Sequence, residues 1–229
     1  MKTITTPAII LRRIDYGEAD RILTLITPEH GKVSAIAKGS RRAKSKLAGG
    51  LELFSITDIH AIDGRGELKT IISVRLQKHF GSIATDLDRT LFAYDCLKAV
   101  DQYTDNQCEK EYFELIHVTL ESLNDPTIDL GVVQAWFMSR LLYLFGAHMN
   151  LEHQVNGAIF SENETYVFDF DNMAFLAHRS GIYAPRHIKF MRLLSKVSAP
   201  KNLLHVADAH KIAGDVLMLL KQSLELAHR

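Results

Sequence analysis

Five cations and no acidic residue stand in segment 38–46, which reads KGSRRAKSK. The small residues between these cations let the backbone come close to a phosphate. Such a run is often only a solvated loop, but cations at this density also neutralise the phosphates of a nucleic acid. We therefore predict that the segment binds DNA or RNA through Lys38, Arg41, Arg42, Lys44 and Lys46.

Further cations in the first 80 residues extend this candidate site: Arg12, Arg13, Arg21, Lys32, Arg65 and Lys69. Isolated cations on strand faces are also common where no ligand binds, and for these six that alternative stays open. Three aromatic residues precede residue 81, namely Tyr16, Phe54 and Phe80, so a stacking platform for bases is small. We expect affinity to come mainly from phosphate charge, with weak sequence preference.

Catalytic chemistry has little support in the sequence. The motifs G-x-G-x-x-G, G-x-x-x-x-G-K-[ST], G-x-S-x-G and H-E-x-x-H do not occur. Asp169 and Asp171 stand two apart in a strand-like segment, which would place both carboxylates on one face, as a metal-dependent hydrolase needs. Strand alternation produces the same pattern without any metal. We predict no catalytic residue, no cofactor and no enzyme activity.

The elements that carry these cations have the patterns of strands. Five apolar or alternating segments occupy 8–14, 21–27, 32–38, 51–62 and 67–76. In the third, Val33, Ala35 and Ala37 share one face and polar residues the other, with Ile36 as the exception. In the fifth, one face holds Leu68, Thr70, Ile72, Val74 and Leu76. Five short strands predict a small barrel, of which OB-fold and SH3-like barrels are the alternatives.

After residue 80 the apolar period becomes helical. We expect two helices with the apolar stripes Leu87, Leu91, Tyr94, Leu97 and Phe113, Ile116, Leu120, Leu123. Asp129 caps a third predicted helix, which ends at Gly146. Segments 158–160 and 166–170 resemble short strands around a turn at 161–164. Segment 186–197 and a C-terminal segment around Leu217 and Leu220 are predicted helices.

A division of charge lies behind the formal net charge of zero. Residues 1–80 hold 14 basic and 8 acidic side chains, a net charge of +6, so the remaining 13 basic and 19 acidic residues give −6. A basic first part suggests a polyanionic partner. Cys96 and Cys108 form no C-x-x-C pair and are expected to be free thiols. Without a membrane-length apolar run or a signal sequence, we expect a cytoplasmic, nucleoid-associated protein.

The first part of the chain resembles the RecO family of recombination mediators. The resemblance lies in 6–13 (TPAIILRR), 15–21 (DYGEADR), 23–32 (LTLITPEHGK) and 37–42 (AKGSRR), and continues in 45–47, 51–54 and 66–68. Over the helical part it is looser, with 137–142 (FMSRLL) followed by Gly146 as its clearest point. It implies an α+β fold, with a five-stranded OB-fold barrel at 1–80 and a mainly α-helical domain at 81–229.

The resemblance also implies a function. A RecO protein binds single- and double-stranded DNA, anneals complementary strands, and works with RecR to load RecA on single strands coated by the single-strand-binding protein SSB. No membrane or small-molecule substrate is implied. An OB-fold module that binds RNA, serving translation or ribosome assembly, stays open as the alternative, because the same cations would bind either polymer.

The chain departs from this family in one region. Many RecO relatives carry two C-x-x-C pairs after the helix that ends near Gly146, whereas here the corresponding segments 152–157 and 177–180 read EHQVNG and AHRS. The histidines in and beside this region, at positions 148, 153, 178 and 187, lack the two-residue gap of a zinc knuckle. We predict a β-hairpin insertion at 147–185 that folds without zinc, on its own apolar residues.

Segment 186–197 offers a second candidate binding site. On a helical wheel its cations cluster on one side beside apolar residues, and the candidate set is Arg186, Lys189, Phe190, Arg192 and Lys196. SSB tails are acidic and end in an apolar aromatic residue, which such a helix would complement. The alternative is an ordinary amphipathic helix with a solvated basic face.

Overall fold

The computed structural model describes residues 3–64, 66 and 68–227, and contacts within it divide the chain into two compact units, Met1–Asp125 and Pro126–Arg229. The predicted domain boundary at residue 80 falls inside the first unit, which holds the barrel and the two helices that follow it. No helix among the described residues is long and apolar enough to cross a membrane.

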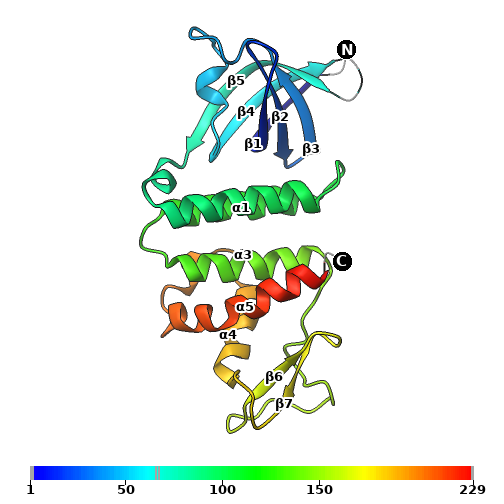
Figure 1. Cartoon of the computed structure of the whole chain (residues 1–229), viewed down its shortest axis with the longest axis vertical. Coiled ribbons are helices and arrows are strands. Elements are labelled where there is room, and N and C mark those ends of the chain that lie inside the picture. Colours follow the sequence, from blue (N-terminus) through cyan, green and yellow to red (C-terminus); the bar gives the residue numbers. More distant parts are fainter. Residues whose placement is uncertain (1–2, 65, 67, 228–229) are drawn as a thin grey trace. The chain divides into compact units, whose positions relative to one another are not determined.

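Five strands form the N-terminal barrel (Figure 1). They are β1 (Thr3–Tyr16), β2 (Asp20–Thr27), β3 (Gly31–Ala37), β4 (Ser55–Asp63) and β5 (Lys69–His79). The order β1-β2-β3-β5-β4 closes because the first half of β1 pairs with β4, and only the short β3–β5 pairing is parallel. A five-stranded barrel with this strand order is the OB-fold, so the predicted α+β class and the predicted barrel are confirmed.

Alternation along the strands fills the barrel interior. Leu23, Leu25, Val33, Ala35 and Ala37 lie in the core, as the predicted face of 32–38 requires. The fifth strand differs from its predicted face: Ile71 is 3% exposed and Ile72 50% exposed. The register runs from Ala61 opposite Ile71 to His60 opposite Ser73, so Ile72 is the extra residue of a β-bulge. A bulge exchanges the two faces of a strand, and residue spacing does not reveal it.

Two helices complete the first unit, α1 (Leu87–Tyr103) and α2 (Lys110–Asn124). The stripe predicted for α2 is confirmed, because Phe113, Ile116, Leu120 and Leu123 are all buried. The stripe predicted for α1 is wrong: Leu97 is buried, but Leu87, Leu91 and Tyr94 are exposed. Helix α1 instead buries the face of Phe92, Cys96 and Val100. It carries two apolar faces, and spacing alone does not decide which one packs.

The second unit packs three helices, α3 (Leu130–Leu144), α4 (Pro185–Lys196) and α5 (Ala209–Ala227). The Asp129 side chain accepts a hydrogen bond from the Val132 N–H, as an N-cap residue does. Gly146 has a φ of +73°, the left-handed conformation that ends a helix, so both predicted boundaries are confirmed. Buried His187 links α4 to α5: its Nδ1 accepts from the Ala184 N–H, and its Nε2 lies 3.0 Å from Asp215.

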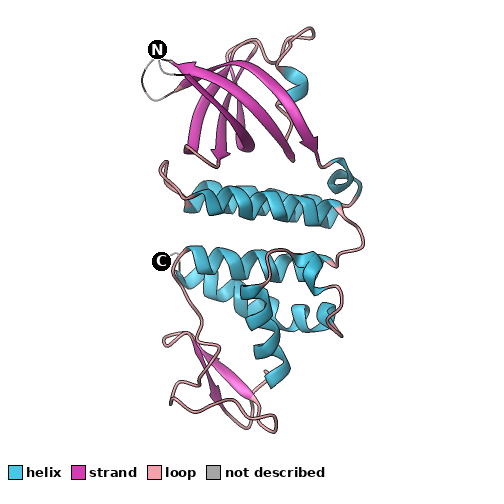
Figure 2. Ribbon diagram, turned by 180° about the vertical axis from the view of Figure 1, so that it is seen from behind, coloured by secondary structure: helices cyan, strands magenta, loops and turns pink. Residues whose placement is uncertain are grey.

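A two-stranded hairpin, β6 (Tyr166–Asp169) and β7 (Ala174–Ala177), precedes α4 (Figure 2). The first predicted strand of the insertion is wrong, since 158–160 forms no strand and β6 pairs with the segment after it. The Asp169 carboxylate accepts from the N–H and the side-chain amide of Asn172, and Met173 takes a φ of +46°. These contacts place the hairpin turn after β6, where the sequence offers neither glycine nor proline.

Candidate nucleic-acid interface

The basic segment 38–46 is docked on the turn between β1 and β2. The Arg41 N–H donates to the Ala19 carbonyl over 2.9 Å, and the Gly39 N–H donates to the Asp20 carboxylate over 2.7 Å. Gly39 has a φ of +64°, a left-handed conformation that a glycine adopts without strain. The chain therefore leaves β3 at a fixed angle and holds the segment against one end of the barrel.

Arg41 and Arg21 share the carboxylate of Asp15. Arg41 Nε lies 3.4 Å from one Asp15 oxygen, and Arg21 Nε donates to the other over 3.2 Å. A second guanidinium nitrogen of Arg41 donates to the Gly17 carbonyl. Of these two predicted DNA-binding residues, Arg41 thus also anchors the segment, and neither one is a free cation.

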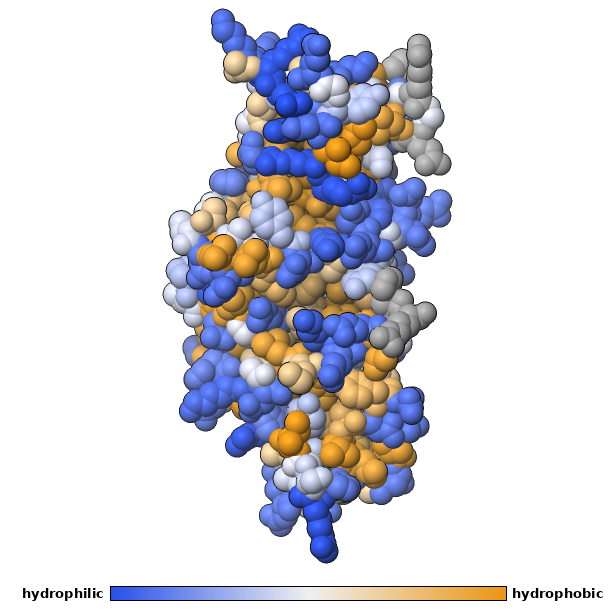
Figure 3. Space-filling model, in the orientation of Figure 1, coloured by the Kyte–Doolittle hydropathy of each residue, from blue (hydrophilic) through white to orange (hydrophobic). Residues whose placement is uncertain are grey.

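Four cations of the basic segment remain available for phosphate: Lys38, Arg42, Lys44 and Lys46 are exposed and make no ion pair within the part of the chain that the structure describes. The surface above the strands in Figure 3 is correspondingly hydrophilic. Exposed, unpaired cations lose little on binding a phosphate, because no internal contact has to break first. The structure therefore concentrates the free positive charge of the barrel in this segment.

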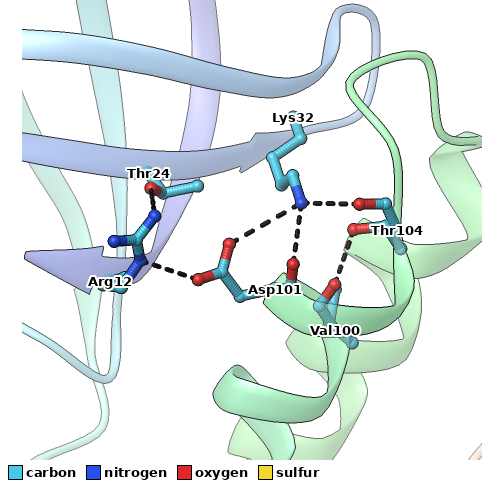
Figure 4. A network of polar contacts seen from close by, with 6 residues as sticks. All are labelled: Arg12, Thr24, Lys32, Val100, Asp101 and Thr104. Atoms are coloured by element: carbon cyan, nitrogen blue, oxygen red, sulfur yellow. Dashed lines mark hydrogen bonds and ion pairs between the residues drawn. The ribbon is translucent and has the colours of Figure 1, made fainter.

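Lys32 is placed differently from the prediction (Figure 4). Its ammonium donates to the carbonyls of Asp101 and Thr104, over 2.7 and 2.5 Å, and lies 3.7 Å from the Asp101 carboxylate. The side chain is 14% exposed. These carbonyls belong to the last turn of α1 and the residue after it, where helical partners are missing and the helix dipole is negative. Lys32 therefore caps α1 and holds it on the barrel, so its prediction as a phosphate ligand is not supported.

Arg12 belongs to the same network but remains accessible. Its Nε donates to the Asp101 carboxylate over 2.8 Å, another guanidinium nitrogen donates to the Thr24 hydroxyl, and 54% of the side chain is exposed. The Asp101 side chain is 15% exposed, so this ion pair is only partly exposed. Lys32 stays beside the carboxylate when Arg12 leaves, which limits the cost of exchanging Asp101 for a phosphate.

The remaining predicted cations divide between paired and undescribed residues. Arg13 contacts Glu52 at 3.2 Å, and Lys69 contacts Asp63 at 2.9 Å. Arg65 lies outside the described residues. The eleven predicted cations thus do not form one uniform surface.

The outer face of the barrel carries a feature that the charge argument missed. Ile14 of β1 stands opposite Ile22 of β2, which stands opposite Ile36 of β3, and Tyr16 follows on β1 with 55% exposure. We call Ile14, Tyr16, Ile22 and Ile36 the outer apolar row. One signal pointed to it: Ile36 was the apolar exception on the polar face of its strand. Strand register, which the sequence does not contain, brings the four residues together.

The insertion does not offer the donors of a zinc knuckle. The buried Gln154 side chain joins two of its segments, donating to the Ile159 carbonyl and accepting from the Ala177 N–H. His178 Nδ1 bonds with Ser180, and no group of three histidine, cysteine, aspartate or glutamate residues in the described chain has the geometry of a metal site. Zinc therefore does not fit the residues present. In the same insertion the Phe160 ring packs edge to face against the rings of Tyr166 and Phe175.

The two carboxylates that suggested catalysis, Asp169 and Asp171, lie at the end of β6 and just after it. Hydrogen bonds from Asn172 lower the pKa of Asp169 below its usual value, and Asp171 lies beyond the end of β6. Burial raises the pKa of the Cys96 thiol well above its usual value, which makes this thiol a poor nucleophile. Desolvation also raises the pKa of the half-buried Cys108. No candidate nucleophile with a nearby base arises from these residues.

Helix α4 keeps its predicted basic side but not its predicted apolar anchor. Lys189 pairs with Glu162, and Arg192 donates to the Leu151 carbonyl near Glu152. Arg186 and Lys196 are exposed. Phe190 is 2% exposed and lies in the core of the unit, so it does not reach a partner on the surface.

Comparison with known proteins finds relatives that are named as DNA repair proteins. The family described as "Recombination protein O N terminal" matches residues 1–80. The DNA repair protein RecO of Desulfatibacillum aliphaticivorans is 33% identical over 158 residues, which cover 68% of this chain and 61% of that protein. The protein of the same name from Alkaliphilus metalliredigens is 32% identical over 161 residues, covering 70% and 65%. The chain thus spans less than two thirds of the curated relatives it matches.

Proposed function

The chain belongs to the RecO family, and from this premise we propose that it is a non-catalytic mediator of DNA repair and homologous recombination that binds DNA through its OB-fold barrel. The observation that carries the proposal is the basic segment, docked on the β1–β2 turn with four exposed and unpaired cations. Those cations would bind the phosphates of single- and double-stranded DNA alike.

The same chemistry supports strand annealing. Two complementary strands repel one another through their phosphates, and a protein that neutralises part of this charge lowers the barrier to their pairing. Cations on a docked but exposed segment reach phosphate oxygens without hiding the base edges. Annealing then needs no catalytic group, consistent with the absence of catalytic motifs in the sequence.

The partners of the proposal are RecR, RecA and SSB, and they rest on family membership. For an acidic SSB tail, α4 offers Arg192 and Lys196 beside a cavity of about 240 Å³ in the second unit. Leu142, Tyr143, Met191 and Leu220 are among its lining residues. With Phe190 buried, this cavity would supply the apolar contact for the aromatic end of the tail.

An annealing assay on complementary strands coated with SSB tests the proposed function. The wild-type chain should accelerate duplex formation, and a variant with Arg42, Lys44 and Lys46 replaced by alanine should not. Binding to single-stranded RNA of matched sequence is the control. No acceleration by the wild-type chain, or a clear preference for RNA, would overturn the proposal.

The SSB-tail site has its own test. Charge reversal in Lys189→Glu/Arg192→Glu should abolish binding of a synthetic tail peptide and leave binding of naked DNA nearly unchanged, because the DNA site lies on the barrel. Lys221→Glu on α5 is the matched control, since it alters an exposed lysine of the same unit. Peptide affinity that survives the double reversal places the tail elsewhere.

A further inference from the structure

The outer apolar row is a continuous strip across three strands. Ile14 and Ile22 are directly opposite in the β1–β2 pairing, and Ile22 and Ile36 in the β2–β3 pairing, so their side chains are neighbours on one face. The next residues along these strands, among them Leu23 and Ala37, point into the core. Alternation therefore turns the three isoleucines outward. Adjacent strands are about 4.8 Å apart, so the row spans roughly 10 Å.

One end of this strip is open to solvent, whereas Ile22 and Ile36 are half-buried. Ile14 is 48% exposed and Tyr16 is 55% exposed, whereas the other two aromatic residues of the barrel, Phe54 and Phe80, are 7% and 1% exposed. Figure 3 shows hydrophobic atoms among hydrophilic ones where β2 and β3 lie in Figure 1. The outer face of a small barrel is normally polar, and a contiguous apolar patch on it marks a binding surface.

Cations border the strip on both sides. Arg12 precedes Ile14 by two residues on the same strand face, with its guanidinium 54% exposed. Lys38 directly follows β3 on the other side, exposed and without an ion pair in the described chain, and leads into the rest of the basic segment. The exposed side chain of Ser34 and the hydroxyl of Thr24 lie beside Arg12. Asp20, opposite Tyr16 in the β1–β2 pairing, is an acid beside the strip, and its carboxylate accepts from the Gly39 N–H. An apolar centre with mainly cationic margins complements an apolar ligand that carries anionic groups along its length.

We propose that the outer apolar row is the base-contacting surface for an unpaired DNA strand, with Tyr16 as its stacking residue. The inference rests on the proposed function and deepens it. An unpaired strand presents base faces and phosphates side by side, whereas in a duplex the base faces are hidden in the stack. The row therefore binds only the unpaired strand, while the basic segment binds both forms. The barrel therefore distinguishes single from double strands, because the row needs exposed bases and the basic segment needs only phosphates.

Two variants test the row: Tyr16→Ala, which removes the ring, and Ile14→Thr/Ile36→Thr, which keeps the β-branched shape that strands favour. Affinity is measured for a thymidine homopolymer, for an abasic strand of the same length, and for a duplex. The affinity of Tyr16→Ala for the homopolymer should fall about 10-fold, because base stacking is lost. Ile14→Thr/Ile36→Thr should also lower it, because apolar contact with the bases is lost. Affinity for the abasic strand and the duplex should stay unchanged, and so should the salt slope, because the phosphate contacts remain.

Controls separate this proposal from the proposed function. Ile159→Thr alters an isoleucine that is 76% exposed in the other unit and should change no affinity, and thermal melts check that each barrel variant folds. An unchanged affinity for the homopolymer, or an equal loss of affinity for homopolymer and duplex, overturns the proposal that the outer apolar row contacts bases. The row would then be a surface for a protein partner. The proposed function survives the failure of the row if the variant with alanine at Arg42, Lys44 and Lys46 binds DNA more weakly than the wild-type chain. If neither kind of variant alters binding, both proposals fail.

Discussion

The cations of the strands and the cations of the basic segment belong to the same barrel but differ in what they touch. Arg13, Arg21 and Lys69 each lie within 3.2 Å of a carboxylate, and Lys32 is enclosed by backbone carbonyls of α1. Lys38, Arg42, Lys44 and Lys46 have no ion pair among the described residues. A count of basic residues therefore overstates the charge that a polyanion can use.

The difference follows from local geometry. Side chains on neighbouring strands stand about 5 Å apart, so a strand cation readily finds an acidic partner across the pairing, as Arg21 finds Asp15. The basic segment lies outside the strand pairings, so among its described cations Arg41 alone reaches a carboxylate, that of Asp15. Paired cations nevertheless differ in how readily they bind a phosphate. Breaking an exposed ion pair costs little free energy, and breaking a nearly buried one costs more.

Neutralising the free cations of the basic segment should have the largest effect on DNA binding. Alanine at Lys38, Arg42, Lys44 and Lys46 is expected to lower single-strand affinity on the order of 100-fold at low salt and to reduce the log–log salt slope by about 3, since each lost phosphate contact contributes about 0.7. Titrations over a range of salt concentrations measure both quantities.

The matched control replaces three strand cations, in Arg13→Ala/Arg21→Ala/Lys69→Ala. This variant should change the salt slope by less than about 1, since each cation already has a carboxylate partner. If the two variants reduced the salt slope equally, paired and free cations would contribute equally to DNA binding, and the distinction between them would be wrong.

Lys32→Met should separate stability from binding. The substitution keeps the apolar stem but removes the donor that caps α1, and we expect the free energy of unfolding to fall by about 1–3 kcal/mol. The salt slope of DNA binding should not change, because Lys32 reaches no phosphate. Urea unfolding and DNA titration of the same preparation measure the two effects. Full stability with weakened DNA binding would show Lys32 to be a phosphate ligand.

Arg12 is intermediate between the paired cations of the strands and the free cations of the basic segment. The variant Asp101→Asn tests this. Loss of the carboxylate releases Arg12. Because this partly exposed pair is worth on the order of 1 kcal/mol, DNA affinity should rise by about fivefold. The double variant Arg12→Gln/Asp101→Asn should lose that gain, which makes a double-mutant cycle the appropriate measurement. An identical gain with and without Arg12 would place the effect of Asp101 elsewhere.

The smallest expected effect is that of chelation. The segments that correspond to the C-x-x-C pairs hold Gln154 and His178 but no cysteine, so a strong chelator should leave the melting temperature unchanged. Metal analysis of the purified protein should find no bound zinc. One tightly bound zinc per chain, or a transition lowered by the chelator, would contradict the zinc-free prediction.

Local patterns predicted what depends on neighbours in sequence. Alternation gave the core face of β3, Asp129 and Gly146 marked the ends of α3, and charge density located the basic segment. What failed depends on distant residues. The partner of Lys32 stands 69 residues further along the chain, the bulge at Ile72 needs the register with β4, and the outer apolar row exists only once three strands are aligned. The buried face of α1 likewise depends on what packs against it.

Gln154 has a consequence for the chemical durability of the second unit. A knuckle built from thiolates opens when oxidants convert the sulfur to higher oxidation states and the metal leaves. A carboxamide that bridges the Ile159 carbonyl and the Ala177 N–H has no such reaction. This bridge should therefore persist under oxidant exposure that would release metal from a thiolate site, and in the hairpin turn Met173 is the side chain that oxidants convert to a sulfoxide.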